Sequence, residues 1–174
     1  MDRIMLVDDE PVVLRALEAA LDSTDFEIEC YSETASALKR LRVTSFDLVL
    51  SDYRMPGMDG IAFLTEVSEI QPETMRMIVS GKADIEALLG AINNAGVFRF
   101  IIKPWDNEQL RNTIQIALDH RAVLIENRRL ADQVREQKQL LGKYKGALEQ
   151  LEAQEPGITK VQRSEDGAII LDDE

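Results

Sequence analysis

The sequence predicts an α/β fold, a doubly wound domain in which five parallel strands form one sheet with helices on both faces. Two observations predict it. Short apolar runs alternate along the chain with longer stretches whose apolar residues recur at helical spacing. Most of the short runs also end on polar residues followed by turn-forming sequence, as buried strands do at the edge of a sheet.

The expected strands are short apolar or alternating runs. They cover residues 4–7, 26–30, 48–52, 77–79 and 98–102. In the second run, apolar residues alternate with Glu27 and Glu29, which indicates an edge strand with a partly solvated face. Helical stripes follow the first four strands and begin at Pro11, Ala35, Gly60 and Ile85. Five such units fit a flavodoxin-like sheet, and we expect this domain to cover residues 1–118.

The last helix of the domain is expected to continue far beyond it. Asp106 and Gln109 form a capping-box-like start, and neither proline nor glycine follows before Gly142. One register then holds, with seam positions at spacings of three and four, as a coiled coil requires. The seam consists of Ile116, His120, Val123, Asn127, Leu130, Val134, Leu141 and Leu148. We therefore expect residues 119–155 to form a coiled-coil helix that pairs as a homodimer, most simply a parallel one.

Polar residues and glycines leave alternatives open for this segment. Asn127 at a core position is typical of a residue that sets register and oligomeric state. His120, the single histidine, is expected to be another polar core residue. Gly142 and Gly146 each weaken a helix interior by about 1 kcal/mol. The alternatives to a dimer are thus a single charged helix or one that folds back.

Residues 156–174 form a tail after the helix. Pro156 and Gly157 end the helix, and β-prone segments at 158–162 and 168–171 flank an Asp-Gly pair. An Asp-Gly pair in such a setting is a hairpin signal, so a small C-terminal β-hairpin is one expectation. A disordered acidic end is the other.

The composition of the chain limits the kinds of partner that it is expected to bind. The 174 residues carry 20 Lys and Arg against 32 Asp and Glu, a net charge of -12. This balance argues against a surface that binds nucleic acid, because neutralising phosphates needs clustered cations. No run is long enough to span a bilayer and no secretory leader follows Met1, so we expect no membrane partner and a cytoplasmic location.

Chemically versatile residues follow four of the expected strands. Asp8 and Asp9 follow the first, Asp52 ends the third, and Ser80 and Lys103 follow the fourth and fifth. In a parallel sheet these strand ends share one face, where three carboxylates would repel each other unless a hard cation such as Mg²⁺ joined them. Lys103 and Ser80 suit a tetrahedral anion, which leaves Asp52 as a nucleophile able to accept a phosphoryl group. Taken singly, each residue could instead be a helix cap, a turn or a strand exit.

With these residues in place, the chain resembles the receiver domain of two-component response regulators across residues 1 to about 120. The resemblance rests on Val7-Asp8-Asp9-Glu10, on Leu50-Ser51-Asp52, on Met55-Pro56-Gly57-Met58-Asp59-Gly60, on Ser80-Gly81, and on Phe100 three residues before Lys103-Pro104. It implies that Asp52 is the phosphoacceptor, phosphorylated from a sensor histidine kinase. It also implies that the chain promotes only its own phosphorylation and dephosphorylation and is not otherwise an enzyme.

The resemblance further implies a metal site and a switch. Mg²⁺ would be held by Asp8, Asp9, Asp52 and the backbone carbonyl of Arg54. On phosphorylation Ser80 would turn toward the phosphoryl group while Phe100 moves inward. In this family the bond between Lys103 and Pro104 is usually cis, in line with the weak trans preference before proline.

Two cations near the site are individual to this chain. Arg54 follows Asp52 by two residues, and Lys82 follows Ser80 by two. Both are expected to flank the path by which water would reach the acyl phosphate. A cation there would pair with the phosphoryl oxygens and crowd the attacking water, so we expect slow self-dephosphorylation.

The output is expected to be binding. After the receiver-like part there is no helix-turn-helix pattern, and the remaining chain is too short for a cyclase or phosphodiesterase domain. We therefore expect phosphorylation to control a dimeric coiled coil that binds a partner protein. One alternative is a constitutive dimeric scaffold whose pocket no longer switches. A phosphatase of the haloacid dehalogenase type is disfavoured, because Arg54 stands where that class needs a second aspartate.

Overall fold

Five parallel strands form one sheet in the order β2-β1-β3-β4-β5, which confirms the predicted flavodoxin-like fold. The computed structural model describes residues 1–22, 26–84 and 95–157. The strands are β1 (Asp2–Val7), β2 (Phe26–Tyr31), β3 (Leu48–Asp52), β4 (Met75–Gly81) and β5 (Arg99–Lys103). As predicted, the second strand lies at an edge of the sheet.

Helices follow the strands in the expected alternation. They are α1 (Pro11–Leu21), α2 (Thr34–Leu41), α3 (Gly60–Ile70), the short 3-10 helix η1 (Lys82–Asp84) and α5 (Asn107–Gln154). The helix expected to begin at Ile85 and the C-terminal hairpin both lie outside the described residues. Among the described helices, none combines the length and the apolar character that a membrane crossing needs.

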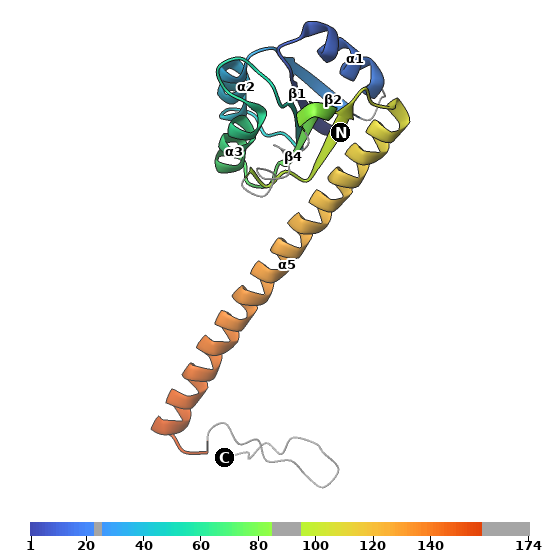
Figure 1. Cartoon of the computed structure of the whole chain (residues 1–174). Coiled ribbons are helices and arrows are strands. Elements are labelled where there is room, and N and C mark those ends of the chain that lie inside the picture. Colours follow the sequence, from blue (N-terminus) through green and yellow to red (C-terminus); the bar gives the residue numbers. More distant parts are fainter. Residues whose placement is uncertain (23–25, 85–94, 158–174) are drawn as a thin grey trace. The chain divides into compact units, whose positions relative to one another are not determined.

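The sheet separates two apolar cores, as alternate side chains of each strand point to opposite faces. On one face Leu6 and Leu50 pack with the buried sides of α1 and of the first turns of α5. On the other face Val7 and Val49 pack with α2 and α3. Figure 1 shows α2 and α3 on one side of the strands and α1 on the other. The central strand β3 is buried along its whole length.

The fifth helix runs past residue 118, as predicted, and its burial changes along its length. Its buried residues all lie in the first turns and are Leu110, Ile114, Ala117 and Leu118. Two further contacts tie the helix to the sheet domain: the His120 ring stacks on Phe98 at 5.2 Å, and Arg121 Nη1 lies 2.7 Å from Asp47 Oδ1. The chain divides into compact units at residues 1–125 and 126–174, and in the second unit the helical residues up to Gln154 are almost all exposed.

The loop after β3 depends on a glycine. A Cβ at Gly60 would overlap the backbone oxygen of Asp52 and come within 3.0 Å of Tyr53 Cα. The backbone N–H of Gly60 also donates to the Tyr53 carbonyl at 2.8 Å. The first residue of α3 therefore packs directly on the backbone at the end of β3, with no room for a side chain.

We expect Gly60→Ala to lower the free energy of unfolding by about 1–3 kcal/mol, the usual cost of overpacking, because backbone atoms cannot move aside as a side chain can. Urea denaturation measures it. Gly81→Ala is the matched control, since its Cβ would meet only a carboxylate oxygen of Asp84 at 3.6 Å. Equal stability of the two variants would contradict the close packing at Gly60.

Candidate functional site

Most of the polar residues singled out in the sequence meet where the parallel strands end, with Asp9 as the exception. In the sheet register Asp52 lies beside Val79 of β4, and Gly81 at the end of β4 lies beside Lys103 of β5. A pocket of about 320 Å³ opens at this edge. Its lining includes Asp52, Ser80, Lys103, Arg54 and Asp84. The residues that follow different strands thus surround one small space.

The Lys103 ammonium joins two carboxylates at this edge. Its Nζ lies 3.0 Å from Asp8 Oδ2 and 2.6 Å from Asp52 Oδ1. Both acids are nearly inaccessible, with 1% of Asp8 and 7% of Asp52 exposed. Buried carboxylates need a cation or hydrogen-bond donors to remain charged. Lys103 supplies the cation for both, and the bond that follows it, to Pro104, is cis as expected.

Backbone groups hold the other oxygens of the two acids. The Glu10 N–H donates to Asp8 Oδ1 at 2.8 Å, and the Arg54 N–H donates to Asp52 Oδ2 at 2.7 Å. Each carboxylate is therefore held at both ends, by the loop that follows its own strand and by Lys103. This fixes the orientation of Asp52 toward the pocket.

The pKa values of Asp8 and of Lys103 are both raised above their ordinary values. Burial raises the pKa of the Asp8 carboxyl, and the nearby Asp52 adds to this, while the Glu10 N–H and Lys103 oppose it. Burial alone would lower the pKa of Lys103, but hydrogen bonds to Asp52 and Asp8 outweigh burial and raise it. Lys103 is therefore charged, and the negative charge around it is in excess.

Ser80 is buried and its hydroxyl is engaged by a third acid. Ser80 Oγ lies 3.2 Å from Asp84 Oδ2, and Ser80 is 2% exposed. The other carboxylate oxygen of Asp84 accepts from Arg54 Nε at 2.7 Å and also from Arg54 Nη2. The Arg54 guanidinium thereby lowers the pKa of Asp84, and Asp84 in turn raises that of Arg54. Sequence reasoning missed Asp84, whose only signal was an acid four residues after Ser80.

The donor set at the strand ends suits a hard cation, although the predicted ligands are not gathered around one point. Asp8 and Asp52 contribute carboxylate oxygens and excess negative charge, as a Mg²⁺ site requires. Asp9 instead lines a neighbouring pocket with Tyr53 and Arg54. Within the part of the chain that the structure describes, no group of three or more acidic, histidine or cysteine side chains is placed to hold a metal ion.

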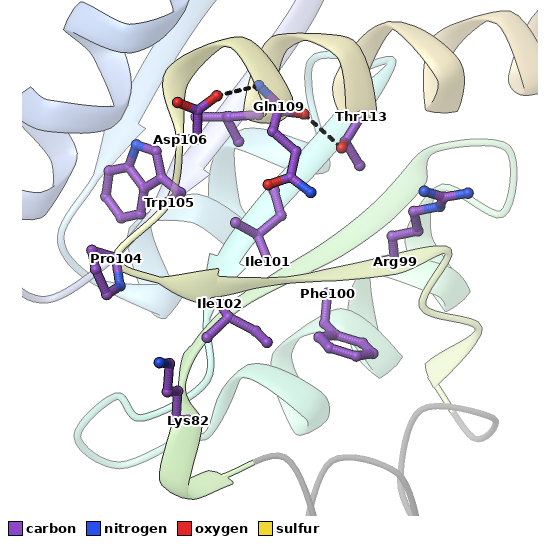
Figure 2. Close-up of a pocket in the computed structure, with 11 residues that line it drawn as sticks. Lys82, Arg99, Phe100, Ile101, Ile102, Pro104, Trp105, Asp106, Gln109 and Thr113 are labelled. Carbon is purple, nitrogen blue, oxygen red and sulfur yellow. Dashed lines mark hydrogen bonds between the residues drawn. The ribbon is translucent and has the colours of Figure 1, made fainter.

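Phe100 faces a second pocket, of about 410 Å³, formed by β5 and the start of α5. Its side chain is 36% exposed, and Figure 2 shows it on the same side of the strand as Ile102. Lys82 lines this second pocket, while its neighbours Gly81 and Ala83 line the one over Asp52, so its place beside the path of water to Asp52 stays a prediction. β4 ends at Gly81 and Lys82 opens η1, where the two-residue period of the strand no longer applies.

Removing the Lys103 ammonium should destabilise the domain. For Lys103→Met we expect a loss of about 2–4 kcal/mol of unfolding free energy at pH 7, because two buried carboxylates lose their cation beside a pocket that admits water. Chemical denaturation measures it. The loss should shrink toward pH 4, since Asp8, whose pKa is already raised, then binds a proton in the folded state. Asp52→Asn is the matched control and should cost less, because Lys103 keeps Asp8; the reverse order would contradict this account.

Comparison with known proteins agrees with this geometry. A family model described as the response regulator receiver domain matches residues 4–115. The hydrogenase transcriptional regulatory protein HoxA of Bradyrhizobium diazoefficiens is 37% identical over 115 residues, which cover 66% of this chain and 24% of that protein. The regulatory protein AtoC of Escherichia coli is 35% identical over 130 residues, which cover 75% of this chain and 28% of that protein. The matched segment thus spans about a quarter of the length of these relatives.

Solved structures share the fold. An uncharacterized protein from Neptuniibacter caesariensis is 35% identical with a TM-score of 0.69, over 72% of this chain and 93% of that one. A CheY-like response regulator receiver domain protein from Methanospirillum hungatei is 27% identical with a TM-score of 0.65, over 70% of this chain and 97% of that one. Receiver domains are signalling domains that accept phosphoryl groups and are not conventional enzymes. The chain belongs to the family of response regulator receiver domains of two-component signalling.

Proposed function

We propose that Asp52 accepts a phosphoryl group from a sensor histidine kinase in a Mg²⁺-dependent reaction, and that its phosphorylation state controls a dimeric coiled-coil output that binds a partner protein. The observation that carries the first part is the meeting of Asp52, Lys103 and Ser80 in one pocket. A cytoplasmic location and the domain limits at residues 118 and 155 belong to the same proposal.

The chemistry of the transfer follows from the Asp52 carboxylate, the Lys103 ammonium and the backbone N–H of Arg54. An oxygen of the Asp52 carboxylate attacks phosphorus, the bond from phosphorus to the donor nitrogen breaks, and its electron pair stays on the donor imidazole. Lys103 Nζ, 2.6 Å from Asp52 Oδ1, is placed to pair with an oxygen of the transferred group. The backbone N–H of Arg54 keeps Asp52 oriented during the attack.

The excess negative charge supports the metal part of the proposal. Asp8, Asp9, Asp52 and the backbone carbonyl of Arg54 would hold Mg²⁺, which when bound neutralises charge on the phosphoryl oxygens. Since Asp8 and Asp52 already share Lys103, the chain compensates only part of the charge gathered there. Asp8 and Asp9 would act only through the metal and would not react themselves.

The proposed path from the site to the output runs through β5. Ser80 would leave Asp84 for the phosphoryl group, and Phe100, now 36% exposed, would move inward. The strand that carries Phe100 leads directly into α5, whose first turns pack on the sheet through Leu110 and Ile114. A shift of β5 therefore reaches the helix. A coupling of about 1–3 kcal/mol would make a useful switch.

Exposed apolar side chains support pairing of the helix. Five apolar residues of the expected seam are between 46% and 67% exposed: Val123, Leu130, Val134, Leu141 and Leu148. Pairing with a second helix would bury this apolar surface. Acidic and basic residues flank the stripe and pair within the helix, as Glu126 does with Arg129. His120 has an intrachain partner in Phe98, so a place for it in the seam stays a prediction together with Ile116 and Asn127.

For the phosphoacceptor, we expect acetyl phosphate with Mg²⁺ to add one phosphoryl group to the wild-type chain and none to Asp52→Asn, as measured by intact mass. Asp22→Asn, an exposed acid at the end of α1, is the matched control and should behave as the wild type. Removing Mg²⁺ with a chelator should stop the reaction. A phosphorylated Asp52→Asn protein would disprove the assignment.

For the output, we expect a dimer in sedimentation experiments that changes shape or mass when beryllofluoride, a phosphoryl mimic, is added with Mg²⁺. The change should vanish in Asp52→Asn. Val134→Asp should weaken the dimer, whereas Gln133→Asp, next to it on the exposed helix, should not. A dimer indifferent to the mimic would favour the constitutive scaffold, and a monomer in every condition would exclude the coiled coil.

A further inference from the structure

Asp84 binds two donors that the phosphoryl group would also need. Asp84 is 6% exposed, and each of its two carboxylate oxygens accepts from a different side chain. Oδ1 accepts from the Arg54 guanidinium, and Oδ2 accepts from the Ser80 hydroxyl at 3.2 Å. These residues line the same pocket as Asp52. We call these three side chains, Arg54, Asp84 and Ser80, the Asp84 network.

We propose that Asp84 is a positioning residue of the phosphoacceptor site, which holds the Ser80 hydroxyl and the Arg54 guanidinium away from Asp52 until a phosphoryl group competes for both. This inference rests on the proposed function of Asp52. It assigns a role to an acid that does not touch the reacting atoms and that acts through the two residues it binds.

The starting positions of the donors favour such an exchange. The Arg54 backbone N–H donates to Asp52 Oδ2 at 2.7 Å, so the Arg54 side chain originates beside the reacting carboxylate. Its guanidinium nevertheless points to Asp84, and the side chain is 71% exposed. An ion pair with one partner in water is weak, so the guanidinium can change partners at little cost.

The contact with Ser80 is also weak. At 3.2 Å the distance from Ser80 Oγ to Asp84 Oδ2 exceeds the usual range for a hydroxyl donor and a carboxylate. Ser80 has a second acceptor, the Gly81 carbonyl, at 3.3 Å. A hydroxyl shared between two long contacts is readily captured by a better acceptor.

A phosphoryl group on Asp52 would be that acceptor. It adds about -1.5 to -2 charges and three oxygens, against the single charge of Asp84. It would therefore draw the guanidinium and the hydroxyl toward Asp52. Until then, Asp84 adds a negative charge to a pocket that an anionic phosphodonor must enter, and it neutralises the guanidinium that would attract that donor. Asp84 thus slows the phosphorylation of Asp52. By competing for the Arg54 guanidinium, it also shortens the lifetime of the acyl phosphate, which that guanidinium shields from water.

The test compares four full-length proteins: the wild type, Asp84→Asn, Arg54→Ala and the double variant. Each is phosphorylated with acetyl phosphate and Mg²⁺, and its later loss of phosphate is followed by intact mass. For Asp84→Asn we expect the second-order rate constant of phosphorylation to rise about three- to tenfold, as for the removal of one like charge near a surface site. We expect the phosphorylated form to last about three times longer or more, since a released Arg54 crowds the attacking water.

Relative to the wild type, both gains should disappear in the double variant, because it lacks the guanidinium that Asp84→Asn releases and its pocket has the same net charge as that of the wild type. Asp84→Glu should restore wild-type behaviour by keeping the charge, which a merely structural role would not predict. Glu18→Gln, an exposed acid on α1, is the control for net charge and should have no effect. If Asp84→Asn does not fold, Arg54→Lys tests the same contact from the other side: a single ammonium holds Asp84 less tightly than a fork of donors, so phosphorylation should again accelerate.

Unchanged kinetics in Asp84→Asn, or gains that persist without Arg54, would overturn the inference. If the wild type is phosphorylated on Asp52 while Asp84→Asn behaves as the wild type, only the role of Asp84 fails. If the wild type takes up no phosphoryl group, the proposed function of Asp52 fails and the role of Asp84 fails with it.

Discussion

The ion pairs from Lys103 to Asp8 and Asp52 are the interaction on which the site depends. The three residues come from the ends of β5, β1 and β3, and Asp8 and Lys103 are 95 residues apart in the sequence. Because β4 lies between β3 and β5, the lysine must reach past the end of a neighbouring strand. Only a parallel sheet in this strand order brings the three charges together. A carboxylate pair without that ammonium would be buried and repulsive.

The loop that follows β3 adds a second constraint, because it returns to the carboxylate that precedes it. The Arg54 N–H binds Asp52, and the backbone at Gly60 packs on the carbonyl of the same residue. The side chain of Arg54 then extends to Asp84 beyond β4. One short loop therefore orients the nucleophile, leads into α3 and connects the site to η1. A change at any of these points would alter the position of the Asp52 carboxylate.

The fifth helix serves two environments in succession. Its first turns belong to the core under the sheet, where Leu110 and Ile114 are buried. Its later apolar residues, such as Leu141, lie exposed in a part of the helix assigned to a separate compact unit. A helix so long cannot cover its apolar stripe with a domain of this size, which is why a second copy of the chain is the natural partner to propose.

The sequence by itself determined the sheet, its edge strand and the residues that meet at its carboxyl ends. Each strand has a local pattern of apolar residues, and the carboxyl ends of parallel strands lie at the same edge of a sheet. The cis bond before Pro104 and the continuation of the last helix could be predicted for similarly local reasons. Which acid each cation binds was decided only by the tertiary structure. Arg54 pairs with Asp84 and Lys82 turns toward β5, since both outcomes depend on how η1 follows β4. Long polar side chains can choose among several partners at similar distance, and their sequence spacing does not rank those partners.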